Sequence, residues 1–198
     1  DPQVLRNLAE PAVGKILFDN FTKAINALTV RDAGAPTVDG YLRLRDTRPF
    51  RTENRPYLVP VRSLFNKIVG EPQAGGLEMA FAAFLDGAPD VAAFAKNYLA
   101  VGFKIDYVRA NGELSHYIPD FIVKTGNGIV WIIETKGRAE LDLPQKMQRL
   151  AQRCAHATAA CAADTGTVHR FVYVDHEGFE RHRPATFAAL PRLTGERT

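Results

Sequence analysis

From Val61 onwards the chain alternates between segments with helical and with strand-like hydrophobic periodicity. Apolar residues recur at i, i+3, i+4, i+7 and i+8 from Leu77 to Leu85, which predicts a helix with one buried face. Residues 91–99 are predicted to form a second, short helix. A long helix is predicted from Pro144 to about Ala163, where apolar residues again fall on one face.

Short apolar runs around these helices predict four strands. A strand over 102–109 is followed by Asn111-Gly112, a typical hairpin turn, and by a returning strand over 114–123. Residues 129–136 predict the third strand, and the nearly continuous apolar run at 168–174 predicts a buried strand beside it. The order is α-β-β-β-α-β, which indicates an α/β fold with a mixed sheet flanked by helices.

Residues 1–60 lack a comparable pattern. Some helical periodicity is present from Asn20 to Leu28, whereas 33–36 and 49–60 contain the glycines and prolines typical of loops. We therefore expect an N-terminal connector or appended subdomain over 1–60 and a main domain over 61–198.

Composition limits the setting more than the function. The chain begins with Asp1 rather than Met, which predicts that it is part of a longer polypeptide. It has no signal-peptide pattern and no run of about 18 apolar residues, so no membrane partner is expected. Cys154 and Cys161 are about 10 Å apart along the predicted long helix, too far for a disulfide, and are expected to be small core residues of a cytoplasmic protein.

The net charge of +3 and the pI of about 8.9 permit DNA binding without requiring it.

Two carboxylates are expected to meet at the polar ends of two otherwise apolar strands. The loop Thr125–Gly128 predicts a hairpin in which residue 124 pairs with 130, so that Asp120 falls opposite Glu134. Carboxylates this close repel each other unless a positive group lies between them. The pattern therefore favours a divalent cation at this point.

These residues resemble the PD-(D/E)xK nuclease superfamily. Pro119-Asp120 corresponds to its PD and Glu134-Thr135-Lys136 to its ExK, and Lys136 shares a strand face with Glu134 because the two are two residues apart. The surrounding residues 117–123 and 132–137 are most similar to the endonuclease domain at the C-terminus of type III restriction subunits. The motif alone is degenerate, but the flanking apolar strands and the turn raise its specificity. The alternative is an ordinary surface hairpin with an Asp–Glu–Lys cluster.

The resemblance implies hydrolysis of DNA phosphodiester bonds by a Mg²⁺- or Mn²⁺-dependent restriction endonuclease. Asp120, Glu134 and the backbone carbonyl of Thr135 would be metal ligands, and the metal would lower the pKa of a bound water. Lys136 would orient that water or balance charge on the phosphate. Glu78, on the first predicted helix, matches an acid that completes the catalytic metal site in several branches; the alternative is an exposed first-turn glutamate favoured by the helix dipole.

Basic residues are candidates for contact with DNA phosphates. Lys146, Arg149 and Arg153 recur along one side of the predicted long helix, where a solvated basic stripe is the favoured interpretation and phosphate contact the alternative. A second group lies in a stretch with only two acids and comprises Arg43, Arg45, Arg48, Arg51 and Arg55. Next to a nuclease motif, phosphate contact by this group competes with a merely solvated surface.

The family also implies partners. These are double-stranded DNA, a helicase or translocase domain earlier in the parent chain, and a methyltransferase subunit. Neither a G-x-x-x-x-G-K-[ST] loop nor a zinc pattern is present. Two alternatives stay open: a nuclease of the same fold in DNA repair or phage defence, and an inert remnant of the fold that binds DNA or protein. The intact Asp120, Glu134 and Lys136 argue against the remnant.

Overall fold

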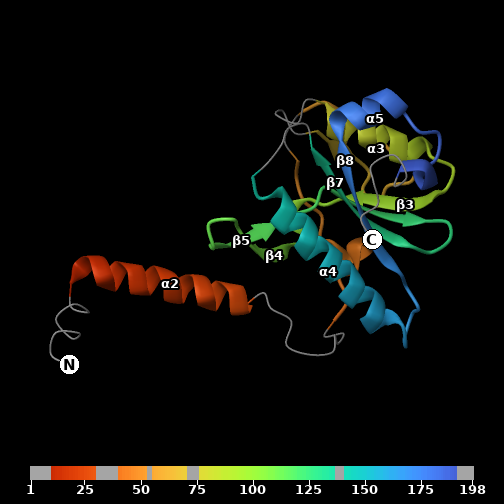
Figure 1. The fold of residues 1–198 in the computed structure, drawn as a ribbon. Coiled ribbons are helices and arrows are strands. Elements are labelled where there is room, and N and C mark those ends of the chain that lie inside the picture. The colour runs from red at the N-terminus through yellow and green to blue at the C-terminus, as the bar shows by residue number, and fades with distance from the viewer. Residues whose placement is uncertain (1–9, 30–39, 53–54, 71–75, 137–140, 191–198) are drawn as a thin grey trace.

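The structure, a computed structural model, describes residues 10–29, 40–52, 55–70, 76–136 and 141–190. It has a mixed α/β architecture in which a four-stranded sheet carries helices on both faces (Figure 1). In spatial order the strands of the sheet are β3 (Val91–Lys96), β6 (Phe121–Thr125), β7 (Val130–Lys136) and β8 (His169–Asp175). The first two pairings are antiparallel and the third is parallel, so the sheet is mixed as predicted.

The other elements surround this sheet or lie at its edges. The helices are α2 (Pro11–Thr29), α3 (Leu77–Gly87), α4 (Leu143–Cys161) and α5 (His176–His182). The remaining strands are β1 (Tyr57–Leu58), β2 (Ile68–Val69), β4 (Ile105–Val108) and β5 (Leu114–Tyr117). Short 3-10 helices span Leu44–Asp46, Leu99–Val101 and Phe187–Ala189.

Helices α3 and α5 cover one face of the sheet and enclose the larger core (Figure 1). Phe81 of α3 is fully buried, and its ring centroid lies 5.6 Å from that of Phe121 in β6 and 5.4 Å from that of Phe179 in α5. These edge-on and tilted contacts join both helices to the sheet.

Helix α4 and the β4–β5 hairpin cover the opposite face. Leu150 of α4 packs there with Ile132 of β7 and Tyr117 of β5 in a second core. Because neighbouring residues of a strand point to opposite faces, Ile132 and Ile133 enter different cores. Strand β7 is thus buried on both sides, which explains its nearly continuous apolar sequence.

Most of the predicted elements lie where the pattern placed them. The first and the long helix, the third strand and the last strand correspond to α3, α4, β7 and β8. Residue 124 pairs with 130 as expected. The turn at Asn111-Gly112 joins β4 to β5, with Gly112 at φ 85°.

The predicted second helix over 91–99 is wrong, because residues 91–96 form strand β3. A register shift between Val91 and Ala93 in the pairing with β6 interrupts the alternation of the strand. Val91 and Phe94, three residues apart, therefore both enter the larger core, a spacing that equally suits a helix.

The strands predicted at 102–109 and 114–123 are also corrected. They shorten to β4 and β5, which form a separate two-stranded sheet, and the second continues as β6 only after a break. Pro119 lies in that break, has no N–H for a ladder and restricts the residue before it. The main sheet and its helices have the order helix, three strands, helix and strand, but the first strand is β3 and not the predicted strand at 102–109.

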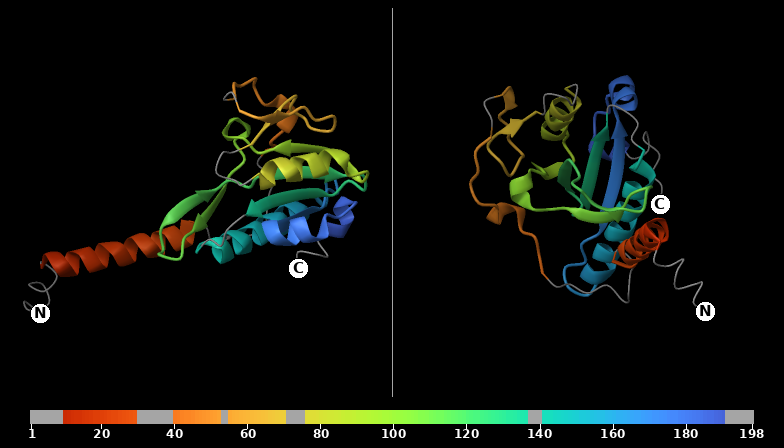
Figure 2. Two further views of the ribbon diagram at one scale, coloured as in Figure 1. Left: turned by 90° about the horizontal axis from the view of Figure 1, so that it is seen from above. Right: turned by 90° about the vertical axis from the view of Figure 1, so that its left-hand side faces the viewer.

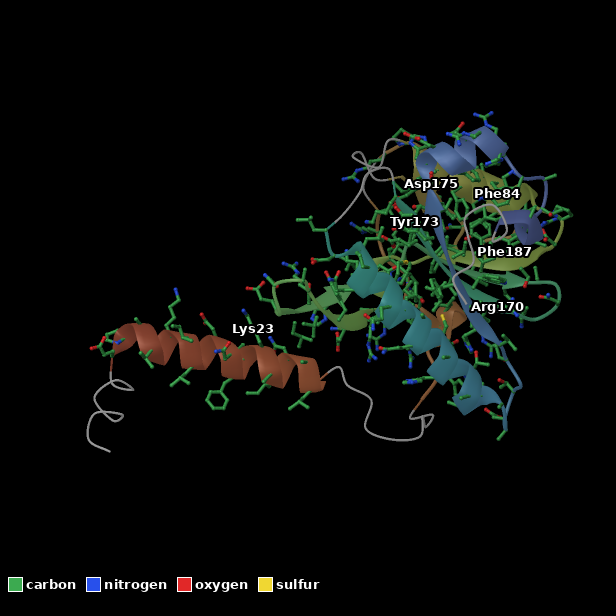
Figure 3. The ribbon with its side chains drawn as sticks, in the orientation of Figure 1. Lys23, Phe84, Arg170, Tyr173, Asp175 and Phe187 are labelled. Carbon is green, nitrogen blue, oxygen red and sulfur yellow. The ribbon has the colours of Figure 1, made fainter. Side chains whose placement is uncertain are left out.

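Helix α2 is longer than the periodicity at 20–28 predicts and extends away from the sheet (Figures 1 and 2). The side-chain amide of Asn26 donates to the carbonyl of Gly112 (3.2 Å), and Lys23 packs against the same glycine (Figure 3). The large apolar side chains of α2 are 39–72 % exposed and comprise Ile16, Leu17, Phe18, Phe21, Ile25 and Leu28.

The predicted domain boundary after residue 60 falls between β1 and β2, which pair with each other.

None of the helices in the described ranges is long and apolar enough to cross a membrane.

The central aromatic contact gives a direct test of the fold. Phe81→Ala should lower the free energy of unfolding by about 3–5 kcal/mol, because it opens a cavity in a core that cannot collapse around it. The same substitution at Phe18, which is 72 % exposed on α2, should change it by less than about 0.5 kcal/mol. Urea unfolding of both variants measures the difference, and equal effects would contradict the packing described.

Candidate active site

Asp120 and Glu134 lie at one end of the β6–β7 ladder. Asp120 immediately precedes β6, and its backbone N–H donates to the carbonyl of Ile133 (2.9 Å). One carboxylate oxygen of Asp120, Oδ2, accepts two hydrogen bonds of 2.7 Å, from the N–H and the hydroxyl of Thr135. Backbone and side chain therefore both hold Asp120 against β7, and the predicted proximity to Glu134 follows from this pairing.

Glu134 is a buried carboxylate whose side chain is only 2 % exposed. Its Oε2 accepts a hydrogen bond from the hydroxyl of Tyr117 (3.1 Å), and its Oε1 lies 2.9 Å from the ammonium of Lys136. This contact agrees with the predicted placement of Glu134 and Lys136 on one strand face. The Lys136 side chain is 32 % exposed, so this ion pair consists of a buried carboxylate and an ammonium group that is accessible to solvent.

Burial raises the pKa of both carboxyl groups. For Asp120, burial is the largest cause; the hydrogen bonds from Thr135 oppose it, and the charge of Glu78 adds to it. For Glu134, burial first and the charge of Asp120 second raise the pKa to about 7, against the lowering effects of Lys136 and Tyr117. Near neutral pH Glu134 is therefore present in both protonated and charged forms, and a further positive charge nearby would favour the charged form of both carboxyl groups.

Glu78, in the first turn of α3, forms an ion pair with Lys96 at the end of β3. The Lys96 ammonium lies 2.5 Å from Glu78 Oε2 and also donates to the carbonyl of Val69 (2.9 Å). The two side chains are 13 % and 7 % exposed, so the alternative of an exposed first-turn glutamate is wrong. Because its charge acts on Asp120, Glu78 belongs to the surroundings of the site, with a cation of its own.

The sequence pattern does not identify Lys96 and Tyr117 as residues of this site. Lys96 lies in the segment predicted to be helical, although it pairs with Phe121, directly after Asp120. A lysine that ends a short apolar strand was the available signal. Tyr117 lies three residues before Asp120, and nothing in its spacing indicates a bond to Glu134 across the break at Pro119.

Strand β8 borders the site on the other side. Tyr173 and Asp175, which Figure 3 labels, pair with Glu134 and Lys136 in the parallel ladder. The carboxylate of Asp175 accepts the N–H of Gly178 (2.7 Å) and caps helix α5. The Asp175 carboxylate therefore serves as the N-cap of α5.

Lys146 of α4 is buried beside the site, so its predicted place on a solvated stripe is wrong. The residue is 9 % exposed, and its ammonium lies 5.6 Å from the ring centroids of Tyr107 and Tyr117. Tyr117 also donates to Glu134. Lys146 is therefore a third lysine near the carboxylates, after Lys96 and Lys136, and the Tyr117 side chain lies between it and Glu134.

The other basic candidates lie nearer to solvent. Arg149 is partly buried and donates to the carbonyl of Asp106 (3.1 Å), and Arg153 is exposed. The predicted arginine group is exposed except for the partly buried last member: Arg43, Arg45, Arg48, Arg51 and Arg55. Phe50 in this segment packs on Tyr98, with the two ring centroids 5.1 Å apart. Because Tyr98 is two residues after Lys96, the segment passes close to the site.

The ligands at this end of the sheet suit a hard divalent cation in kind. Asp120 and Glu134 offer carboxylate oxygens, which Mg²⁺ and Mn²⁺ prefer. Within the described ranges, however, no group of three or more His, Cys, Asp or Glu side chains is gathered so as to hold a metal ion. Thr135 contacts Asp120 through its N–H and hydroxyl, and the role of its carbonyl as a ligand stays a prediction.

Comparison of the chain with family models, with curated proteins and with solved structures finds no match in any of the three. The site therefore has to be interpreted from its own geometry.

The pKa of Glu134 predicts how stability depends on pH in the metal-free protein. The folded protein binds this proton more tightly than the unfolded chain, whose glutamate has an ordinary pKa of 4.5. The stabilisation is complete below about pH 4.5 and is lost as the pH rises to about 7, a fall of at most about 3 kcal/mol in the free energy of unfolding. Urea unfolding at several pH values measures it.

Glu134→Gln is the critical comparison, because glutamine cannot titrate. The variant should lose most of this fall, whereas the exposed control Glu177→Gln should keep it. A fall of the same size in Glu134→Gln would show that Glu134 is not the titrating group.

Proposed function

We propose that this chain is a DNA endonuclease domain of the PD-(D/E)xK type that hydrolyses phosphodiester bonds with the help of a divalent cation. The residues around its motif resemble those of the C-terminal cutting domain of type III restriction subunits. The observation that carries the proposal is the meeting of Asp120, the buried Glu134 and Lys136 at one end of the β6–β7 hairpin.

The arrangement of the main sheet supports this proposal. Apart from the β4–β5 hairpin, which lies between β3 and β6 in the chain, the order is α3, β3, β6, β7, α4 and β8, and β7 pairs with β8 in parallel. That is the order expected from the resemblance. The motif residues stand at the ends of the two central strands, where Lys136 reaches solvent although Glu134 beside it is buried.

The charges of the site support a cation-dependent reaction. Asp120 and Glu134 would hold the cation, with the Thr135 carbonyl as a further ligand. A bound Mg²⁺ or Mn²⁺ supplies charge that neutralises the scissile phosphate and makes a water easier to deprotonate. Its positive charge would also oppose the effect of burial and of the neighbouring carboxylates, which raise the pKa of both carboxyl groups.

Lys136 has the position needed for a role in the reaction itself. Its ammonium is bonded to Glu134 and partly open to solvent, so it can reach a water or a phosphate oxygen. As a compact charge it would orient the attacking water or balance the charge that builds on the phosphate. Arg48 and Arg51, exposed on the segment that passes Tyr98, would contact the phosphates of the duplex.

The family from which the resemblance comes supplies the rest of the proposal. In that setting a helicase or translocase domain and a methyltransferase subunit would deliver double-stranded DNA and select the site. The rival functions within the same fold are nucleases of DNA repair or phage defence.

One observation favours the second candidate, an inert remnant that only binds DNA or protein. Glu78 is paired with Lys96 and Glu134 with Lys136, so two of the three carboxylates already have internal cations. A site whose negative charge is largely balanced in this way has less need of a metal. Cleavage assays separate the two candidates.

Substitution of the three motif residues tests the proposed chemistry. Asp120→Asn, Glu134→Gln and Lys136→Met should each lower the rate of cutting of long duplex DNA by at least about 10²-fold, and the double variants should lose little more because the residues act as one unit. Conversion of supercoiled plasmid to nicked and linear forms measures this rate.

Matched variants keep this test specific. Glu177→Gln and Lys104→Met change exposed residues of the same types and should cut like the wild type. Normal cutting by Asp120→Asn would end the nuclease proposal, and DNA binding without any cutting by the wild type would favour the inert remnant.

The choice of cation gives a separate prediction. Mg²⁺ and Mn²⁺ should support cutting, whereas Ca²⁺ should compete with them and support it poorly, because it is larger and tolerates looser geometry. The assay is a cation series in the plasmid experiment, with EDTA as the blank. Cutting that persists in EDTA would exclude the proposed role of the carboxylates.

A further inference from the structure

A cavity of about 780 Å³ lies between α4 and the sheet, at the other end of β7 from the candidate active site. Its floor includes Ile122 of β6 and Val130 and Ile132 of β7, and one wall is formed by small residues of α4 such as Ala157. Residues 40–45 and Phe103 line it as well. Its size is that of a pocket for a small organic ligand.

The charged side chains among the residues that line this cavity have one sign. None of the residues that line it within the described ranges is acidic. The basic lining residues are Arg43, Arg45, Lys124 and Arg153, together with His156 and His169. Burial lowers the pKa of His169, and the charge of Arg153 lowers it further, as expected in a positive field.

Three of these cations have no counter-ion of their own. In the part of the chain that the structure describes, the side chains of Arg43, Lys124 and Arg153 make no hydrogen bond or ion pair. Lys124 and Arg153 come from β6 and α4, on two sides of the cavity, and Arg43 comes from a third segment. Like charges that converge on one apolar space favour an anionic ligand.

We propose that this cavity is a nucleotide-binding site, in which a base lies against Phe103 and Ile122 and the phosphates are held by Arg43, Lys124 and Arg153. Arginine side chains present forked donors to phosphate oxygens, and an aromatic side chain accepts the flat face of any base. Side chains would hold the phosphates here, because the chain has no glycine-rich phosphate loop.

The number of cations distinguishes a nucleotide from other anionic ligands. A fatty acid carries a single carboxylate and needs one cation with a long apolar channel. Several separated cations around a wide pocket instead match a ligand with several negative charges next to a ring. The ligand can be a free nucleotide or one nucleotide of a single strand, and the two sources share this chemistry.

The cavity is separate from the candidate active site but next to it. Ile132 lines the cavity and stands two residues, or about 7 Å along the strand, before Glu134. It packs with Tyr117, which donates to Glu134, so the second core lies between ligand and carboxylates. Nucleotide binding does not depend on the proposed cleavage and is tested without it.

Fluorescence anisotropy of ATP labelled with N-methylanthranilate tests the site, with EDTA present so that cutting plays no part. The wild type should bind the probe, and Ala157→Trp, which fills the cavity, should weaken binding at least tenfold. Ala155→Trp makes the same change at an exposed position of α4 outside the lining and should bind like the wild type. Arg153→Glu and Lys124→Glu should each weaken binding about tenfold, and Arg181→Glu on exposed α5 should not.

Competition identifies the ligand. Unlabelled ATP should displace the probe from the wild type; stronger displacement by a short oligothymidylate than by ATP would assign the site to a single strand, and the reverse to a free nucleotide. Circular dichroism confirms that the tryptophan variants are folded. Absence of probe binding, equal binding by Ala157→Trp and Ala155→Trp, or displacement by dodecanoate but not by ATP or the oligonucleotide would each overturn the proposal.

Discussion

The buried carboxylate of Glu134 is the constraint around which this end of the molecule is organised. A charge with a side chain only 2 % exposed is unfavourable unless hydrogen bonds and a cation compensate for its lost hydration. Tyr117 and Lys136 provide that compensation from β5 and from β7 itself. The β4–β5 hairpin, although outside the main sheet, is therefore held to it by a polar contact as well as by the second core.

The same constraint explains why the break at Pro119 matters. If β5 continued straight into β6, Tyr117 would remain in the sheet and could not face Glu134 from the α4 side. The break moves Tyr117 to the second core and leaves Asp120 at the start of β6, where Thr135 fixes its carboxylate. Pro119, which has no backbone N–H, thus allows Tyr117 to contact Glu134 from the hairpin while Asp120 pairs within the main sheet.

The sequence predicts the parts of this fold whose patterns are local. The hairpin register follows from the loop at Thr125–Gly128, and the helices α3 and α4 follow from one-sided periodicity. Strand β3 could not be predicted in this way, because its register shift gives Val91 and Phe94 a helical spacing. The candidate site shows the same division. Asp120, Glu134 and Lys136 follow from the hairpin, whereas Lys96 and Tyr117 reach it through tertiary contacts that no spacing encodes.

The balance of charge decides how the site can respond to a cation. Asp120, Glu134 and Glu78 contribute three carboxylates, and Lys96 and Lys136 contribute two ammonium groups. Burial is the largest cause of the raised pKa of Glu134 and the charge of Asp120 adds to it, so a proton on Glu134 also reduces the excess of negative charge. A divalent cation would replace that proton and would exceed the remaining negative charge unless a phosphate arrived with it. A site balanced in this way would bind the cation weakly by itself and more tightly together with a nucleic-acid phosphate. In the proposed nuclease, the cation would then be bound mainly when DNA is present.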